Sequence, residues 1–189
     1  MNRVVLALAL SLSLLRPGVS GAVGELLLGA AGRTRHRIVI PDGHADAKIE
    51  VAVRQAAELL QRAFRENGIE LPLVAEAEAT DGQPGIYLGQ TEFARSHGID
   101  FGAMEGWSYR FKAVAPHLIV AGNDRPDPIP LERRRPREAR SGGMPMLGTL
   151  KGVTEFLYQY AGVRFLMHGE HGLEFLPTPV LFVPDDLDV

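Results

Sequence analysis

The architecture of this 189-residue chain can be worked out from residues 147–177, LGTLKGVTEFLYQYAGVRFLMHGEHGLEFLP. Apolar residues recur there at intervals of three and four, which predicts a helix with one apolar face: Leu147, Leu150, Val153, Leu157 and Tyr160. Gly162 follows the last of them, where a helix most often ends with a left-handed cap. Val163–Leu166 is then predicted to be a short buried strand, and the HGEHG after it a loop. The apolar helix face requires a sheet, so other strands must come from upstream.

A second helix is predicted between Asp46 and Gly68. Aspartate is a favoured residue at helix N-termini, and Asn67-Gly68 is a typical helix end. Apolar residues again repeat at helical spacing between these ends: Ile49, Val53, Ala56, Leu60 and Phe64. Charged residues lie off this face, so the helix is predicted to be amphipathic.

Short extended segments alternate with turn residues over the rest of the chain. They are predicted at Arg37–Ile40, Leu71–Val74, Gly85–Gly89, Trp107–Ala113, Leu118–Ala121, Glu174–Leu176 and Val180–Val183. The turn Ala115-Pro116-His117 is predicted to join two of them as a hairpin. Glu92–His97 is expected to form a single helical turn.

This order of elements predicts an α+β fold, with a mixed, largely antiparallel sheet and two main helices packed on one face. We expect one domain over residues 35–184. The helix residues expected to be buried are Ile49, Val53, Leu60, Phe64, Leu150, Val153 and Leu157. The strand residues expected beneath them are Val39, Ile86, Leu88, Phe111 and Ile119.

Composition excludes several classes of protein. The net charge is -3, and 46% of the residues are hydrophobic and 23% charged, as in ordinary globular domains. Basic residues are scattered except in one run, so we expect no nucleic-acid partner. The absence of cysteine excludes thiol catalysis and thiolate metal sites.

Residues 1–22 are predicted to be a signal peptide. Arg3 precedes an apolar run from Val4 to Leu15, and Ser20-Gly21-Ala22 supplies small residues at the cleavage region. The alternative is an uncleaved N-terminal anchor. We expect export to the cell envelope, the periplasm or the medium, with no membrane span in the mature chain.

The segment Pro126–Pro145 interrupts the pattern of helices and strands. It contains several prolines and the run Arg133-Arg134-Arg135, which exclude a regular helix or a central strand. We expect a solvated loop that is less ordered than the rest of the domain and that trypsin cleaves first. The alternative is a loop that contacts an acidic ligand or a neighbouring domain.

Two motifs suggest metal or phosphate binding, and neither fits. His168 and His171 are three residues apart around a glycine, whereas the HExxH zinc motif needs histidines four apart on a helix. Gly143–Thr149 has the glycine spacing of a phosphate-binding loop but lacks its lysine. The start of the following helix remains a weak general anion site. We therefore predict no metal and no cofactor.

No pair of carboxylates is singled out for glycoside hydrolysis, which needs two acidic groups about 5 to 10 Å apart. The acidic residues considered are Glu105, Glu132, Glu155, Glu170 and Glu174. His117 lies at the expected hairpin turn and is interpreted as a surface residue. The sequence therefore predicts no catalytic residue.

A family resemblance rests on the order of several short motifs. They are Ile38-Val39-Ile40-Pro41, Ala56–Leu60, Gly68–Pro72, Ile86–Gly89, Leu118–Gly122, Gly148-Thr149-Leu150, Glu155-Phe156-Leu157 and Gly162–Leu166. Together they resemble the N-terminal domain of secreted alpha-glucuronidase-like and beta-N-acetylhexosaminidase-like glycoside hydrolases. The resemblance spans Arg37 to Val183. The long segment Pro126–Pro145, and His168 in place of a common proline, depart from the pattern.

The resemblance implies a non-catalytic accessory domain of an exported carbohydrate-degrading enzyme. Its partner would be a catalytic (β/α)8 barrel, normally in the same chain, and a carbohydrate is a further candidate partner. One alternative is a free-standing envelope module that binds a glycan or a protein. Another is a small self-sufficient hydrolase, which would need two carboxylates facing one pocket.

Overall fold

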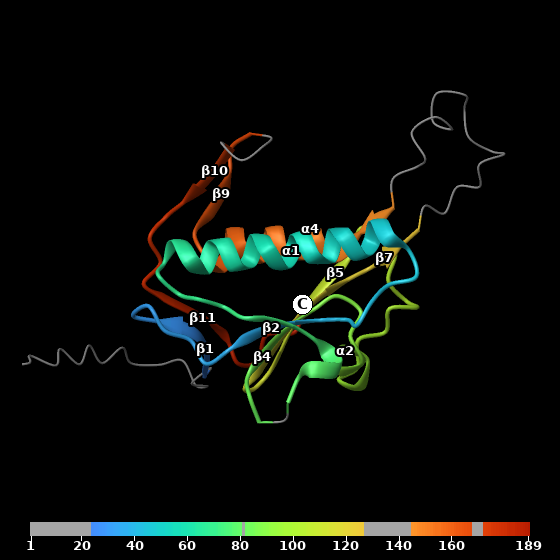
Figure 1. The fold of residues 1–189 in the computed structure, drawn as a ribbon, viewed down its shortest axis with the longest axis horizontal. Helices are drawn as coiled ribbons and strands as arrows, with labels where there is room; N and C mark the ends of the chain where they lie inside the picture. The colour runs from blue at the N-terminus through green and yellow to red at the C-terminus, as the bar shows by residue number, and fades with distance from the viewer. Residues whose placement is uncertain (1–23, 81, 127–144, 168–171) are drawn as a thin grey trace, which may run out of the picture.

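The structure, a computed structural model, describes residues 24–80, 82–126, 145–167 and 172–189. Its centre is a five-stranded sheet in the order β3-β2-β4-β6-β5 (Figure 1). The strands are β3 (Leu73–Ala75), β2 (Arg37–Ile40), β4 (Gly85–Leu88), β6 (His117–Gly122) and β5 (Tyr109–Val114). The first four run parallel, and β5 pairs antiparallel with β6 as the predicted hairpin.

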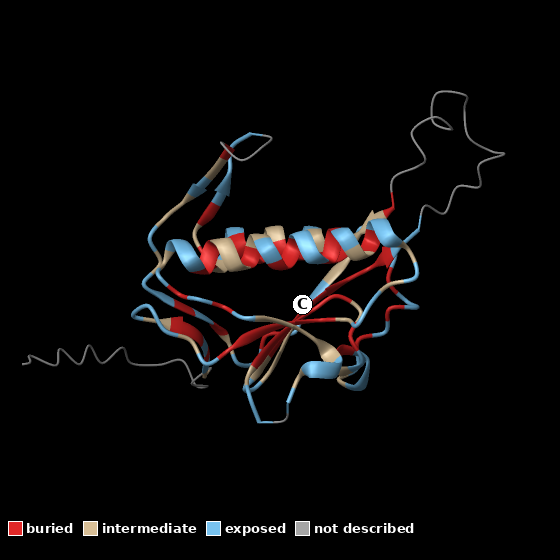
Figure 2. Cartoon of the chain, viewed as in Figure 1, coloured by how far each residue is buried: buried red, intermediate tan, exposed pale blue. Residues whose placement is uncertain are grey.

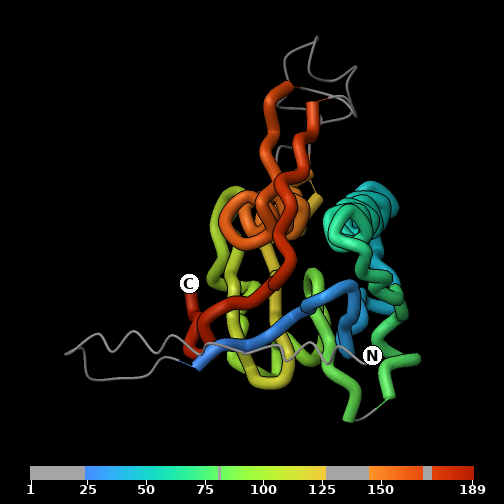
Figure 3. Tube along the Cα trace, turned by 90° about the vertical axis from the view of Figure 1, so that its left-hand side faces the viewer, coloured from blue at the N-terminus to red at the C-terminus, as the bar shows by residue number. Residues whose placement is uncertain are grey.

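Two long helices, α1 (Ala47–Glu66) and α4 (Gly148–Tyr160), lie side by side on one face of this sheet (Figures 1 and 3). The carboxylate of Asp46 accepts a hydrogen bond from the Lys48 amide at 2.8 Å, which confirms the predicted N-cap. Gly68 and Gly162 have φ of 73° and 65° after the two helix ends. Both glycines were expected there, since this conformation costs other residues free energy.

The core between helices and sheet contains most of the residues predicted for it. Ile49, Val53, Leu60, Phe64, Val153 and Leu157 are buried against Ile86, Leu88 and Phe111. Leu150 is only half-buried. Val39 and Ile119 are buried but face the other side of the sheet, so their predicted contact with the helices is wrong. Central parallel strands are apolar on both faces, and the sequence pattern does not say which residue faces which layer.

A thinner layer covers the second face of the sheet. It consists of α2 (Glu92–Ser96), which was predicted as a helical turn, and the loop after it. Ala94, Ile99, Phe101 and Met104 pack there on Val39, Tyr87, Ile119 and Ala121. Figure 2 shows the central strands buried along their length, as expected for a sheet covered on both faces.

Three two-stranded ribbons surround this core. They are β1 (Glu25–Ala30) with β11 (Val180–Pro184), β9 (Val163–Phe165) with β10 (Leu173–Phe175), and β7 (Asp124–Arg125) with β8 (Met146–Leu147). β1 precedes the expected boundary at residue 35, yet its Leu26 and Leu28 are buried in the main core. β9 is a strand as predicted, but Arg164 and Phe165 are exposed, so its predicted burial is wrong. β10 pairs with β9 in a two-stranded ribbon and does not join the central sheet.

The last residues of the chain cover the edge of the central sheet at β5. The Phe111 amide donates to the Val189 carbonyl at 2.8 Å, and the Val189 amide donates back at 2.9 Å. Asp188 forms ion pairs with Arg110 at 3.0 Å and Lys112 at 3.3 Å on the same strand. This pairing protects an edge that would otherwise offer free backbone groups to another strand.

The α+β class with a mixed sheet is confirmed. Four strand pairs are antiparallel and three parallel over the described residues, and the parallel ones all lie in the central sheet. The parallel pairs arise because helix α1 connects β2 to β3, and because the chain then crosses over from β3 to β4 on the other side of β2. Among the described residues, no helix combines the length and apolar character needed to cross a membrane. The predictions for residues 1–22, for 127–144 and for His168–His171 lie outside the described residues.

Candidate functional site

A cavity of about 170 Å³ opens at the carboxyl ends of β2 and β4. These strands are neighbours and parallel, but their outgoing connections diverge. β2 leads to α1 on one face of the sheet, and β4 leads to α2 on the other. In open sheets of this kind, ligands bind in the crevice where neighbouring connections leave in opposite directions. The cavity therefore lies at the position in the fold that is best suited to binding.

Polar groups from both connections line this cavity. His44 follows β2, and its Nδ1 accepts a hydrogen bond from the Asp46 amide at 3.0 Å, which leaves Nε2 to carry a proton and act as a donor. Gln90 follows β4, and its side-chain amide nitrogen donates a hydrogen bond to the backbone carbonyl of Asp124 at 2.9 Å. The side-chain oxygen of Gln90 stays available as an acceptor. Ile40, Pro41 and Val53 supply an apolar wall.

Two arginines approach the cavity from opposite layers. Arg54, on α1, lies 3.7 Å from Glu50, and both side chains line the cavity. Arg95, on α2, lies 3.3 Å from Glu92, and its guanidinium stacks 4.9 Å above the Phe101 ring. Each arginine is paired but about half-exposed, so each retains donors for a ligand.

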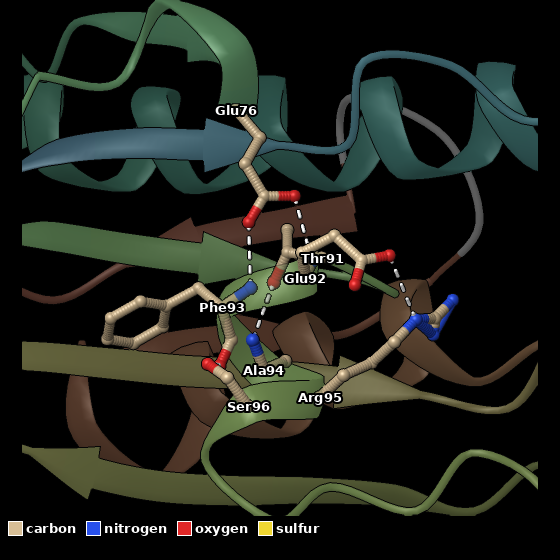
Figure 4. Close-up of polar contacts among 7 residues, drawn as sticks. All are labelled: Glu76, Thr91, Glu92, Phe93, Ala94, Arg95 and Ser96. Atoms are coloured by element: carbon tan, nitrogen blue, oxygen red, sulfur yellow. Dashed lines mark hydrogen bonds and ion pairs between the residues drawn. The ribbon is translucent and has the colours of Figure 1, made fainter.

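The short helix α2 that carries Arg95 is held firmly at its start (Figure 4). The carboxylate of Glu76, from the 3-10 turn η1 (Glu76–Glu78), accepts from the Glu92 and Phe93 amides at 2.9 and 2.8 Å. The Thr91 hydroxyl accepts from the Ala94 amide at 3.1 Å. These bonds satisfy backbone donors that a helix start leaves open. Arg95 therefore projects from a helix whose first turn is held by these hydrogen bonds.

Asp124 is a buried carboxylate beside this cavity that sequence reasoning missed. It follows β6, and its side chain accepts hydrogen bonds from both the amide and the hydroxyl of Thr149 at the start of α4. The Thr149 hydroxyl in turn accepts from the Gly122 amide at 3.0 Å. Burial raises the pKa of Asp124 above its ordinary value of 3.8, and the bonds from Thr149 oppose that rise. Asp124 therefore acts as the cap of α4.

The hydrogen bonds from Thr149 to Asp124 give the Gly148-Thr149 motif a structural role. The start of α4, considered above as a weak anion site, already has a carboxylate of the same chain on its first amides. Gly148 and Gly122 lie so close that a Cβ on either would overlap the backbone of the other segment. The two glycines permit the close crossing of β6 and α4, which is a packing role.

The acidic residues weighed for catalysis are spread over the molecule. Glu105 is exposed, Glu155 is half-buried on α4, and Glu174 on β10 lies 3.8 Å from Arg164. Glu132 and Glu170 lie outside the described residues. In the segments 24–80, 82–126, 145–167 and 172–189, no cluster of three or more histidine or carboxylate side chains could hold a metal ion.

His117 is less exposed than its predicted position at a turn implied. It is the first residue of β6 and is half-buried, with Nδ1 accepting from the Gly85 amide at 3.1 Å. Its ring packs against Phe93 and Tyr87, with centroids 5.0 and 5.6 Å apart. Burial lowers the pKa of His117, and the nearby His97 lowers it further. These contacts give His117 a structural role.

A second candidate surface is apolar and lies away from the cavity. Ten large apolar side chains are exposed among the described residues. Four of them lie on the ribbons β1-β11 and β9-β10, and two more, Leu166 and Met167, directly follow β9. These six, here called the apolar side, are Leu27, Phe165, Leu166, Met167, Val180 and Phe182. The ribbons β1-β11 and β9-β10 occupy the same side of the molecule, the left in Figure 1 and the front in Figure 3. Concentration of exposed apolar residues on one side marks an interaction surface.

Carboxylates on the elements around the cavity are engaged within the chain. Glu50, which lines the cavity, pairs with Arg54, Glu92 pairs with Arg95, and Glu76 accepts from backbone amides at the start of α2. Comparison with protein-family models gives no match to this chain, and comparison with curated protein sequences gives none.

Proposed function

We propose that this chain is a non-catalytic accessory domain of an exported carbohydrate-degrading enzyme and that it docks on the catalytic domain through its apolar side. The observation that carries the proposal is the concentration of exposed apolar residues on β1-β11 and β9-β10. On β1-β11 the alternate residues Leu26, Leu28 and Leu181 fill the core, so Leu27 and Phe182 face outward.

The family resemblance supports the choice of partner. It implies a (β/α)8 barrel in the same polypeptide, and the sheet with two helices on one face agrees with the domain it implies. Exposed large apolar side chains are candidates for contact with a partner domain. The apolar side carries six of them. Export through a signal peptide at residues 1–22 belongs to the same proposal.

The gene provides the first test of this proposal. A reading frame that continues past Val189 into about 250 residues with the alternating strand and helix pattern of a barrel is the expected result. A frame with no such sequence on either side of the chain would contradict the accessory role. It would favour the alternative of a free-standing envelope module that binds a glycan or a protein.

Activity of the purified chain separates this proposal from a self-sufficient hydrolase. We expect no release of nitrophenol from nitrophenyl glycosides of glucuronic acid or N-acetylglucosamine, because the sequence singles out no carboxylate pair and, among the described residues, Glu50 is the one carboxylate that lines the cavity at β2 and β4. Turnover that persists through purification and is abolished by changing one glutamate or aspartate would overturn the proposal. The variants Glu155→Gln and Glu105→Gln are the first to make.

A further inference from the structure

The cavity at the carboxyl ends of β2 and β4 has a chemistry that the accessory role does not require. Donors and acceptors occupy it together. The donors are Arg54, Arg95 and the Nε2 proton of His44, and the acceptors are Glu50 and the side-chain oxygen of Gln90. Such a mixture suits a ligand that carries both an anionic group and hydroxyl groups.

The two arginines determine where the anionic group would lie. A guanidinium presents its donors in a planar fork that matches a carboxylate, and two such groups come from opposite layers of the fold here. Arg95 is oriented by Glu92 and by the Phe101 ring, and its helix is anchored by Glu76. A ligand would therefore meet at least one donor group that is already positioned.

The local charge distinguishes a carboxylate from a phosphate. Glu50 and Glu92 offset the charges of Arg54 and Arg95 one for one. A dianion would add repulsion from both carboxylates, whereas a single negative charge can be shared between the two guanidinium groups. The charges thus favour a monoanion.

The volume restricts the ligand to a small molecule. The cavity of about 170 Å³ lies well below the roughly 300 Å³ at which pockets for drug-sized ligands begin. One sugar ring or a short acid fits this space, whereas an oligosaccharide does not. The wall formed by Ile40, Pro41 and Val53 offers an apolar surface for the C–H face of a ring.

From these observations we propose that the cavity binds a small hydroxylated carboxylic acid, of the size of one sugar acid, with its carboxylate between Arg54 and Arg95 and its hydroxyl groups toward Glu50 and Gln90. This site is independent of the apolar side. Failure of binding would leave the docking surface untouched, and the reverse also holds.

The test uses the purified chain and sodium galacturonate, with galactose and inorganic phosphate as comparison probes. Binding is followed by amide chemical shifts in NMR spectra, which also show that each variant is folded. We expect galacturonate to shift the Gly43 and Gln90 amides in a saturable way, and galactose to do so at least about tenfold more weakly, since it lacks the group that forms charge-assisted hydrogen bonds.

Variants assign the carboxylate to the two arginines. Arg54→Gln and Arg95→Gln should each weaken galacturonate binding by about tenfold or more. Arg65→Gln is the matched control, because Arg65 lies at the far end of α1 and pairs with Glu70 at 3.7 Å, and it should leave the affinity unchanged.

Three results would overturn this inference. They are the absence of any saturable shift with galacturonate, equal binding of galactose and galacturonate, and binding that both arginine variants retain. Tighter binding of phosphate than of galacturonate would also contradict it, because the site would then prefer a dianion.

Discussion

Individual polar residues hold the crossing between β6 and α4 together. Asp124 is only 3% exposed, and its side chain accepts hydrogen bonds from the amide and the hydroxyl of Thr149. The buried carboxylate costs free energy through desolvation, which the raised pKa reports, and the bonds to Thr149 offset this cost. The contribution of Asp124 to stability therefore depends on both hydrogen bonds from Thr149.

Replacing Asp124 by alanine should destabilise the fold. We expect Asp124→Ala to lower the free energy of unfolding by about 1–3 kcal/mol, because the amide and hydroxyl of Thr149 lose a buried partner. Urea denaturation measures this change. Asp186→Ala is the control, since Asp186 is exposed, and it should stay within about 0.5 kcal/mol of the parent. An unchanged free energy of unfolding in Asp124→Ala would mean that the desolvation cost cancels the stabilisation from the cap.

The buried His36 makes stability depend on pH. Burial lowers its pKa from the ordinary value of 6.5, and the neighbours His117 and Arg35 add to this effect, while a bond to the Pro116 carbonyl at 3.0 Å opposes it. The unfolded chain therefore binds the proton more readily than the folded one. The stabilising contribution of neutral His36 is present above pH 6.5 and is lost as the pH falls through the lowered pKa.

The unfolding free energy should accordingly fall as the pH decreases from neutral through 6.5, the ordinary pKa of histidine. His36→Gln should reduce this slope, because glutamine has no proton to gain. Urea denaturation at several pH values measures the effect. An unchanged slope in His36→Gln would show that other groups cause the pH dependence.

At the scale of elements, the two long helices carry the core. Leu60 on α1 and Leu157 on α4 have no exposed surface and pack in the same cluster. We expect Leu60→Ala or Leu157→Ala to lower the free energy of unfolding by about 2–5 kcal/mol, the range for truncating a large core side chain. Chemical denaturation measures both. Val51→Ala, at an α1 position that is 54% exposed, is the control and should cost less than about 0.5 kcal/mol.

The elements that could be predicted are those whose signals are local. α1 has an apolar stripe and caps at both ends, so its sequence alone predicts its bounds. β1 was missed because its apolar run follows directly on the apolar N-terminal segment, and its partner β11 lies far away in the chain. Val39 and Ile119 were assigned to the wrong face because strands buried on both sides show no alternation.

The candidate site could not be predicted for a related reason. No motif spacing links His44, Arg54 and Arg95. His44 and Arg54 come from the connection after β2, whereas Arg95 comes from the connection after β4, and it reaches the same cavity only because β2 and β4 are neighbours in the sheet. A usable signal existed for Asp124, a charged residue that comes almost directly after the predicted buried strand Leu118–Ala121, which is β6 (His117–Gly122) in the structure. A polar residue at the end of a predicted buried strand is therefore a candidate site or capping residue in such a sequence.

At the scale of the whole molecule, two surfaces remain after the core is formed. The cavity lies at the carboxyl ends of the parallel strands, and the apolar side lies on the ribbons β1-β11 and β9-β10. Their separation allows one to bind a ligand while the other is covered by a partner domain. The account therefore depends most on whether the apolar side is covered in the complete gene product.

Hydroxyl-radical footprinting tests this directly, by comparing the isolated chain with the longer, full-length protein that the proposed accessory role expects its gene to encode. The account predicts that oxidation of Met167, Leu166 and Phe182 falls several-fold in the full-length protein. Trp107 and Val51 are exposed on other elements and serve as controls, whose oxidation should not change. Equal oxidation of the apolar side in both proteins would contradict the proposed docking.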